Sequence, residues 1–136
     1  MKKCIICDVD GTLAEMIDRK PYDWHKVHTD IVKPHVRDIV NRFYDTHEII
    51  IFTGRDGVCA EATEKWLKDN DINYHQFYSR AVDNYEKDSI IKERLFNNHV
   101  KDKYDVDFVL DDRNQVVNMW RRKLGLNCLQ IQEGNF

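Results

Sequence analysis

The sequence predicts a three-layer α/β fold, in which a parallel sheet of about five strands is covered by helices on both faces. Short apolar segments alternate along the chain with stretches of helical periodicity, which is typical of strands joined by helical crossovers. Polar residues that suit chemistry follow several of the apolar segments directly. The length of 136 residues suits one domain, so we expect residues 1–136 to form a single domain with one site.

The expected strands are short, and the first is bounded by Asp-Gly, a strong turn signal. The weakest of them is the third. They span residues 3–9, 47–52, 74–78, 106–110 and 127–131.

The expected helices lie between these strands. Pro34 suits a first helical position, and a second helical pattern follows Gly57. Residues 88–99 and 114–124 form the last two, and Gly125 ends the final helix. Right-handed crossovers make such a sheet parallel, and ligands then bind beyond the carboxyl ends of its strands.

Composition indicates a soluble globular protein. The formal net charge is -3, and positive and negative residues are mixed along the chain, so the broad basic excess of many nucleic-acid binders is absent. This balance does not exclude a local basic patch. The first seven residues are too few and too polar for a signal or membrane-spanning segment, and we expect a cytoplasmic protein without a membrane partner.

Cys4 and Cys7 should point to opposite faces of a strand, which favours core thiols over a zinc site.

Two pairs of carboxylates are expected at the same edge of the sheet. Asp8 and Asp10 follow the first strand, and Asp111 and Asp112 follow the fourth. Either pair alone is common as a helix cap, but together they would repel one another unless a cation lies among them. Carboxylates, a carbonyl and water suit Mg²⁺, so the pattern predicts a magnesium site.

The second strand is followed by Thr53-Gly54-Arg55, which supplies a hydroxyl, a backbone turn and a guanidinium for binding phosphate. The alternative is a plain turn in which Arg55 pairs with a surface acid. Lys87 opens the helix before the fourth strand and could balance phosphate charge, whereas Lys92 should face elsewhere. His25 and His28 are interpreted as surface residues of a loop.

These residues resemble the four motifs of the haloacid dehalogenase (HAD) superfamily, which has a Rossmann-like fold. The motifs are Asp8-Val9-Asp10-Gly11-Thr12-Leu13, Thr53, Lys87 and Asp111-Asp112. A closer similarity is to the 3'-phosphatase domain of bacteriophage polynucleotide kinase/phosphatases. It covers residues 8–14, Arg19, residues 53–55 and 87–88, and especially residues 110–122.

The resemblance implies a phosphoaspartate mechanism. Asp8 would be the nucleophile and a metal ligand, and Asp10 the general acid and base, with its carbonyl on the metal. Asp111 or Asp112 would complete the magnesium site. By the same resemblance Thr53 and Lys87 would hold the phosphate and Asp88 would support them, while Arg19, Gly54, Arg55 and Arg80 would contact substrate phosphates.

The spacing between motifs leaves no room for a sizeable cap domain, so we expect an open site that admits a nucleic-acid end. No Gly-x-x-x-x-Gly-Lys-Ser/Thr loop is present, which predicts phosphatase without 5'-kinase activity and leaves room for a separate kinase or ligase partner. Tyr22 and Trp24 are candidates for stacking on a base, with ordinary packing an equal alternative. The sequence does not decide between DNA and RNA as the substrate, or whether 2',3'-cyclic phosphate ends are also hydrolysed. The alternatives are a small-molecule HAD phosphatase and, less favoured, an aspartate-phosphorylated signalling module.

Overall fold

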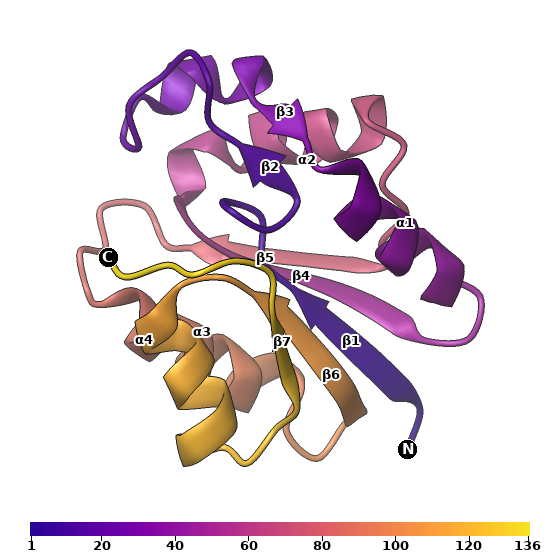
Figure 1. The fold of residues 1–136 in the computed structure, drawn as a ribbon. Coiled ribbons are helices and arrows are strands. Elements are labelled where there is room, and N and C mark those ends of the chain that lie inside the picture. The colour runs from indigo at the N-terminus through magenta and orange to yellow at the C-terminus, as the bar shows by residue number, and fades with distance from the viewer.

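A computed structural model describes residues 1–136 and places a five-stranded parallel sheet at the centre of the protein (Figure 1). The strand order is β5-β4-β1-β6-β7, so β1 lies in the middle. The strands are β1 (Lys3–Cys7), β4 (Glu48–Asp56), β5 (Gln76–Arg80), β6 (Asp105–Asp111) and β7 (Cys128–Gln130). The predicted parallel sheet is confirmed.

Helices cover both faces of this sheet. Figure 1 shows α1 (Pro34–Phe43) and α2 (Ala60–Asp69) above it, and α3 (Asp88–His99) and α4 (Asn114–Asn118) below it. The last helix continues as a π-helical turn, η3 (Met119–Lys123), and the short 3-10 turn η2 (Gly57–Cys59) precedes α2. One apolar cluster packs on each face, which confirms the three predicted layers.

The two cysteines of β1 show how the strand divides its side chains. Cys7 belongs to the cluster under α1 and α2, whereas Cys4 belongs to the cluster against α4 and η3. Both are fully buried free thiols, and burial raises the pKa of Cys4 to about 12. Their predicted role as core residues on opposite faces is confirmed.

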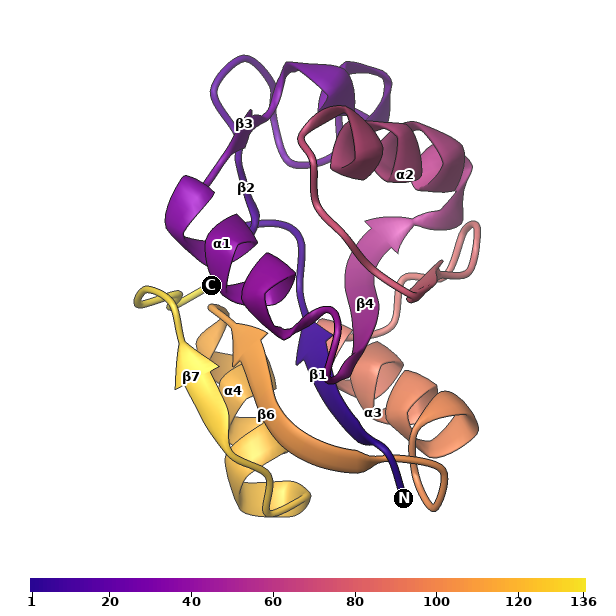
Figure 2. The same cartoon turned by 90° about the vertical axis from the view of Figure 1, so that its right-hand side faces the viewer.

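The segment between β1 and α1 contains structure that the sequence pattern did not predict. The short strands β2 (Ala14–Glu15) and β3 (Ile31–Val32) pair antiparallel, and the 3-10 helix η1 (Trp24–Thr29) lies between them (Figure 2). His25 and His28 are exposed as expected, but on this helix rather than on a loop. The segment is compact and no sizeable cap domain is present, as predicted.

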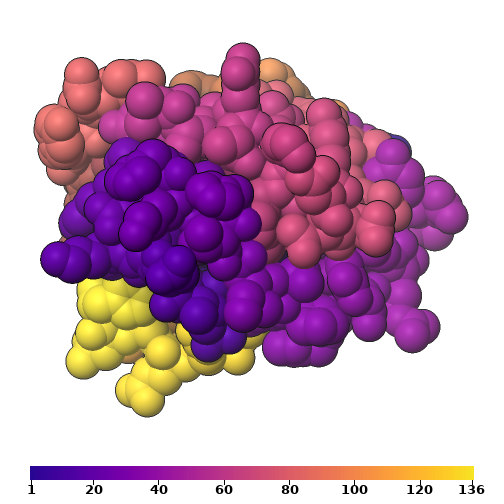
Figure 3. Space-filling view, turned by 90° about the horizontal axis from the view of Figure 1, so that it is seen from above, coloured from indigo at the N-terminus to yellow at the C-terminus, as the bar shows by residue number.

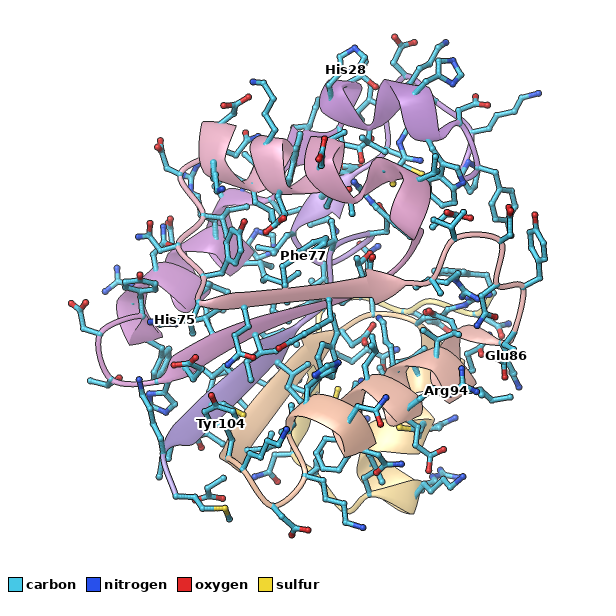
Figure 4. The ribbon with its side chains drawn as sticks, turned by 180° about the vertical axis from the view of Figure 1, so that it is seen from behind. His28, His75, Phe77, Glu86, Arg94 and Tyr104 are labelled. Atoms are coloured by element: carbon cyan, nitrogen blue, oxygen red, sulfur yellow. The ribbon has the colours of Figure 1, made fainter.

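The two ends of the sheet have different surroundings. Figure 4 shows His75 and Tyr104 at the end where the strands begin, and Glu86 and Arg94 near the end where they finish. The C-terminus also lies near the finishing end (Figure 1). None of the helices combines the length and the apolar character needed to cross a membrane.

Candidate active site

The carboxylates of Asp8, Asp111 and Asp112, which we call the acidic cluster, gather where the neighbouring strands β1 and β6 end. All three residues are buried, and one carboxylate oxygen from each lies within 4.8 Å of the others. The pKa of Asp8 is raised well above its usual range by burial and by the nearby charge of Asp111. Burial also raises the pKa of Asp112. The cluster is therefore costly to keep ionised without a cation.

Lys92 supplies one such cation, and the expectation that it faces elsewhere is wrong. Its Nζ donates to Asp8 Oδ1 at 2.7 Å and to Asp111 Oδ2 at 3.0 Å, and its side chain is 1% exposed. Lys87, which was expected to fill this role, is exposed, and its ammonium group makes no hydrogen bond or ion pair. Residues five apart on a helix project about 140° apart, so only one of the two lysines can face the site.

The two neighbouring carboxylates of the β6 end are bonded differently. Asp111 has both oxygens occupied, because Oδ1 accepts from the Asp112 backbone N–H and Oδ2 accepts from Lys92 and from the buried indole of Trp120. Asp112 Oδ2 is buried and has no hydrogen-bond partner, and no other buried side-chain oxygen or nitrogen shares this condition. A Cβ at Gly11, where φ is +78°, would lie 1.9 Å from that oxygen. Glycine at position 11 is therefore required for the carboxylate to enter.

These features fit a divalent metal ion. Three buried carboxylates face a single ammonium group, which leaves an excess of negative charge in a medium of low polarity. The unpartnered Asp112 oxygen provides an open ligand, and an all-oxygen donor set suits a hard cation. The acidic cluster can thus hold a divalent ion.

Asp10 lies beside this cluster and is fixed by Arg19 and Arg55, which we call the arginine pair. Arg55 donates from Nη2 to Asp10 Oδ1 at 2.6 Å and from Nε to both carboxylate oxygens at 3.1 Å. Arg19 Nη2 reaches the same Oδ1 at 3.2 Å. Both guanidinium groups also bind buried Asp30, with distances from 2.6 to 2.9 Å.

The arginine pair therefore has internal partners, although the sequence interpretation assigned both residues to substrate phosphates. The side chains of Arg19 and Arg55 are 0% and 1% exposed. Asp30, which joins them, was missed, because an aspartate before a two-residue strand carries no local signal. The alternative that Arg55 pairs with a surface acid is also wrong, since both of its acidic partners belong to the site. Trp66 fixes this corner by donating from Nε1 to the Asp30 carbonyl at 2.8 Å.

Thr53 and Gly54 lie on the last residues of β4, which continues further than predicted. The Thr53 hydroxyl accepts from the Arg55 backbone N–H at 3.1 Å, and its own proton stays available for a phosphate oxygen. A Cβ at Gly54 would lie 2.1 Å from Asp88 Oδ1. Asp88 Oδ2 lies 3.8 Å from the ammonium of Lys92, so this carboxylate links the Gly54 turn to the acidic cluster.

Arg80 ends β5 and holds the backbone around it. Nε donates to the Gly54 carbonyl at 2.8 Å, Nη1 donates to the carbonyls of Asn84 and Glu86, and Nη2 lies 3.5 Å from Asp88 Oδ1. The structure thus brings Arg80 to the rim of the site in a structural role. Its predicted contact with a substrate phosphate stays a prediction.

Comparison with known proteins agrees with this geometry. Residues 2–136 match the family described as the polynucleotide kinase PNKP phosphatase domain. A putative bifunctional polynucleotide kinase/RNA ligase of Autographa californica nuclear polyhedrosis virus is 36% identical over 123 residues, which cover 88% of this chain and 18% of the viral protein.

Solved structures give the same result. A chain from a Pnkp1/Rnl/Hen1 complex superposes with a TM-score of 0.97 at 39% identity, over 100% of this chain and 48% of that one. A chain from the Pnkp1/Rnl/Hen1 RNA repair complex gives 0.96 at 39% identity, over 99% and 44%. The chain therefore spans about half of the solved chains and about a fifth of the viral relative.

Proposed function

Because the chain belongs to the family of PNKP phosphatase domains within the HAD superfamily, we propose that it removes the 3'-phosphate from the ends of DNA or RNA through a phosphoaspartate intermediate. One observation carries the proposal. The carboxylate of Asp8 is held between the ammonium of Lys92 at 2.7 Å and the hydroxyl of Thr12 at 3.1 Å, at the open end of the sheet. A fixed carboxylate beside a buried cation suits attack on a phosphoryl group.

In the proposed reaction, Asp8 attacks phosphorus and Asp10 protonates the departing 3'-oxygen. The bond from phosphorus to that oxygen breaks as the bond to Asp8 forms, and the product is a 3'-hydroxyl. Asp10 then takes a proton from the water that hydrolyses the phosphoaspartate. Lys92 and the Thr53 hydroxyl balance charge on the phosphoryl oxygens, and the arginine pair holds Asp10 in place.

We assign the metal position to Mg²⁺. Asp8 and the backbone carbonyl of Asp10 would hold it, as the resemblance to HAD phosphatases implies. Of the two carboxylates that follow β6 we choose Asp112, because it retains an unpartnered oxygen whereas both oxygens of Asp111 are occupied. Asp111 would then orient Lys92 and the backbone of Asp112. The ion would supply neutralising charge at the phosphoryl group.

The absence of a cap supports a polymeric substrate, because no extra domain covers the finishing end of the sheet. Glycines occur only at positions 11, 54, 57, 125 and 134, so these residues contain no phosphate-binding loop of the kinase type. We therefore propose phosphatase without 5'-kinase activity in this chain. The relatives are described as a kinase/RNA ligase and as chains of Pnkp1/Rnl/Hen1 complexes, which supports a separate kinase or ligase partner. A ligase would use the 3'-hydroxyl that this reaction produces.

A panel of substrates tests the proposal. Purified protein is mixed with 3'-phosphorylated DNA and RNA, 5'-phosphorylated controls, nucleoside 3'-monophosphates and sugar phosphates, with Mg²⁺ or with EDTA. We expect release of phosphate from 3' ends only, in the presence of the metal, and none from Asp8→Asn. Turnover of small phosphates with 3'-phosphorylated oligonucleotides untouched would refute the assignment. Phosphate transfer from ATP to a 5'-hydroxyl would refute the lack of kinase activity.

A further inference from the structure

Two tyrosines are unusually exposed for aromatic residues. Tyr22 is 82% exposed in the segment between β2 and η1, and Tyr85 is 87% exposed in the segment between β5 and α3. A single exposed ring is common on protein surfaces, so the surroundings of these two decide whether they bind a ligand. The two rings come from different parts of the chain, so their common surroundings indicate what they bind.

Each tyrosine lies on a loop that an arginine of the site holds in place. Arg19, which contacts Asp10, also donates from Nη1 to the carbonyls of Lys20 at 3.3 Å and Pro21 at 3.1 Å, next to Tyr22. Arg80, which contacts the Gly54 carbonyl, donates from Nη1 to the carbonyls on both sides of Tyr85. The backbone that carries each ring is thus held by an arginine that also contacts the site.

The two loops are also neighbours on the surface. Figures 1 and 3 both show the segment that follows β1 and the loop that follows β5 on the same side of the protein, and in Figure 3 they lie next to each other at the left. Trp24 supports the first ring, because its own ring meets Tyr22 edge to face with centroids 5.9 Å apart. Each of the two neighbouring loops therefore presents an exposed aromatic ring on this side of the protein.

Each loop also carries an unpaired cation. Lys20 and Lys87 lie two residues from Tyr22 and Tyr85, and both are exposed with ammonium groups that make no hydrogen bond or ion pair. Of the acids on these loops, Glu86 is neutralised by Arg94 through two hydrogen bonds of 2.8 and 2.9 Å. Asp23 accepts from the Lys20 backbone N–H and Asp83 accepts from the Tyr85 hydroxyl, so one carboxylate also lies beside each tyrosine. An aromatic face beside a free ammonium is the combination that binds single-stranded nucleic acid, where bases stack and phosphates pair.

We propose that Tyr22 and Tyr85 stack on nucleobases of the single strand next to its 3'-phosphate, while Lys20 and Lys87 contact the phosphates of its backbone. This inference rests on the proposed function and adds how the site recognises a polynucleotide. Stacking on a ring tolerates any base, so the contact gives affinity for a strand without sequence preference.

The test compares Tyr22→Ala and Tyr85→Ala with Tyr22→Phe and Tyr85→Phe on two substrates. One is a single-stranded oligonucleotide with a 3'-phosphate, as DNA and as RNA, and the other is p-nitrophenyl phosphate, which has no base. Each alanine variant should lower kcat/KM for the oligonucleotide by about 5- to 150-fold more than for p-nitrophenyl phosphate. The phenylalanine variants keep the ring and should stay within about twofold of the wild type.

The lysines are tested through salt dependence. Lys20→Ala and Lys87→Ala should each reduce the slope of log KM against log salt for the oligonucleotide by about 0.7, because one phosphate contact of a single strand is lost. Leu129→Ala, at a half-exposed residue of the edge strand β7, is the control and should leave both kinetics and slope unchanged.

The outcomes separate this inference from the function beneath it. If the wild type acts on p-nitrophenyl phosphate but not on 3'-phosphorylated strands, the proposed function fails. If it acts on strands but the alanine variants lose both activities equally, or neither, the tyrosines do not bind bases and the inference is overturned. A slope that Lys20→Ala and Lys87→Ala leave unchanged overturns the phosphate contacts.

Discussion

Replacing Lys92 with methionine tests the charge balance of the site most directly. The change keeps an unbranched side chain but removes an ammonium that is 1% exposed and lies 2.7 Å from Asp8 and 3.0 Å from Asp111. Removing one partner of a buried ion pair costs about 3–5 kcal/mol, because the remaining charge has no compensation. Since two carboxylates lose the same cation here, we expect the free energy of unfolding of the metal-free protein to fall by about 4–5 kcal/mol near pH 7.

The cost should depend on pH in a defined direction. Without Lys92, the folded state favours a protonated Asp8 even more strongly, so folding takes up a proton and the loss of stability shrinks as the pH is lowered. Urea unfolding of wild type and variant in EDTA, between about pH 5 and pH 8, measures this.

Lys87→Met is the matched control for Lys92→Met. It makes the same chemical change at an exposed residue just before α3 and should shift stability by no more than about 0.5 kcal/mol. On 3'-phosphorylated oligonucleotides, Lys92→Met should lower kcat by at least about 100-fold. Equal stabilities for the two variants, or full turnover by Lys92→Met, would show that the buried ammonium does not compensate the acidic cluster.

Three further substitutions have defined outcomes. Burial raises the pKa of Asp8 in the folded state, so the metal-free wild type loses stability as the pH rises through that pKa. Asp8→Asn should be inactive, but urea unfolding at pH 7 should show it to be more stable than the wild type. This gain in stability should vanish near pH 4. Gly54→Ala places a Cβ 2.1 Å from Asp88 Oδ1 and should lower the free energy of unfolding by about 1–3 kcal/mol; an unchanged urea midpoint would contradict the close packing. Arg55→Lys loses the forked contact to Asp10 and should lower kcat by about 10- to 100-fold with little change in KM, whereas a dominant rise in KM would instead indicate a substrate-binding arginine.

The fold could be predicted because its signals are local. Helix α3 begins at Asp88 and ends at His99, as periodicity predicted, and the last helix ends before Gly125, whose φ of +66° suits glycine. The pair β2 and β3 was missed because strands of two residues have no period to detect. The extension of β4 to Asp56 was missed because it depends on pairing of Asp56 with Arg80 in β5, a contact distant in sequence.

The site was harder to predict, because motif residues identify chemistry but not partners. The carboxylates Asp8, Asp111 and Asp112 were placed together because all strands of a parallel sheet finish at the same edge. The choice of Lys87 over Lys92 was wrong. Which lysine reaches the site depends on which face of α3 packs against the sheet, and the sequence of α3 has no distinct apolar face that would show this. Ile91 and Lys92 are both buried, so an apolar residue and a charged one share that face.

The distribution of cations leads us to expect that a metal ion must bind before phosphate does. The arginine pair faces Asp10 and Asp30, so two guanidinium groups balance two carboxylates and neither is left over for the substrate. The acidic cluster has only Lys92, and its remaining negative charge would repel a phosphate dianion. A divalent ion removes that repulsion, whereas the lysines at the rim are too exposed to compensate buried charge. We therefore expect Mg²⁺ to bind without substrate, and the phosphate group to bind weakly until the ion is present.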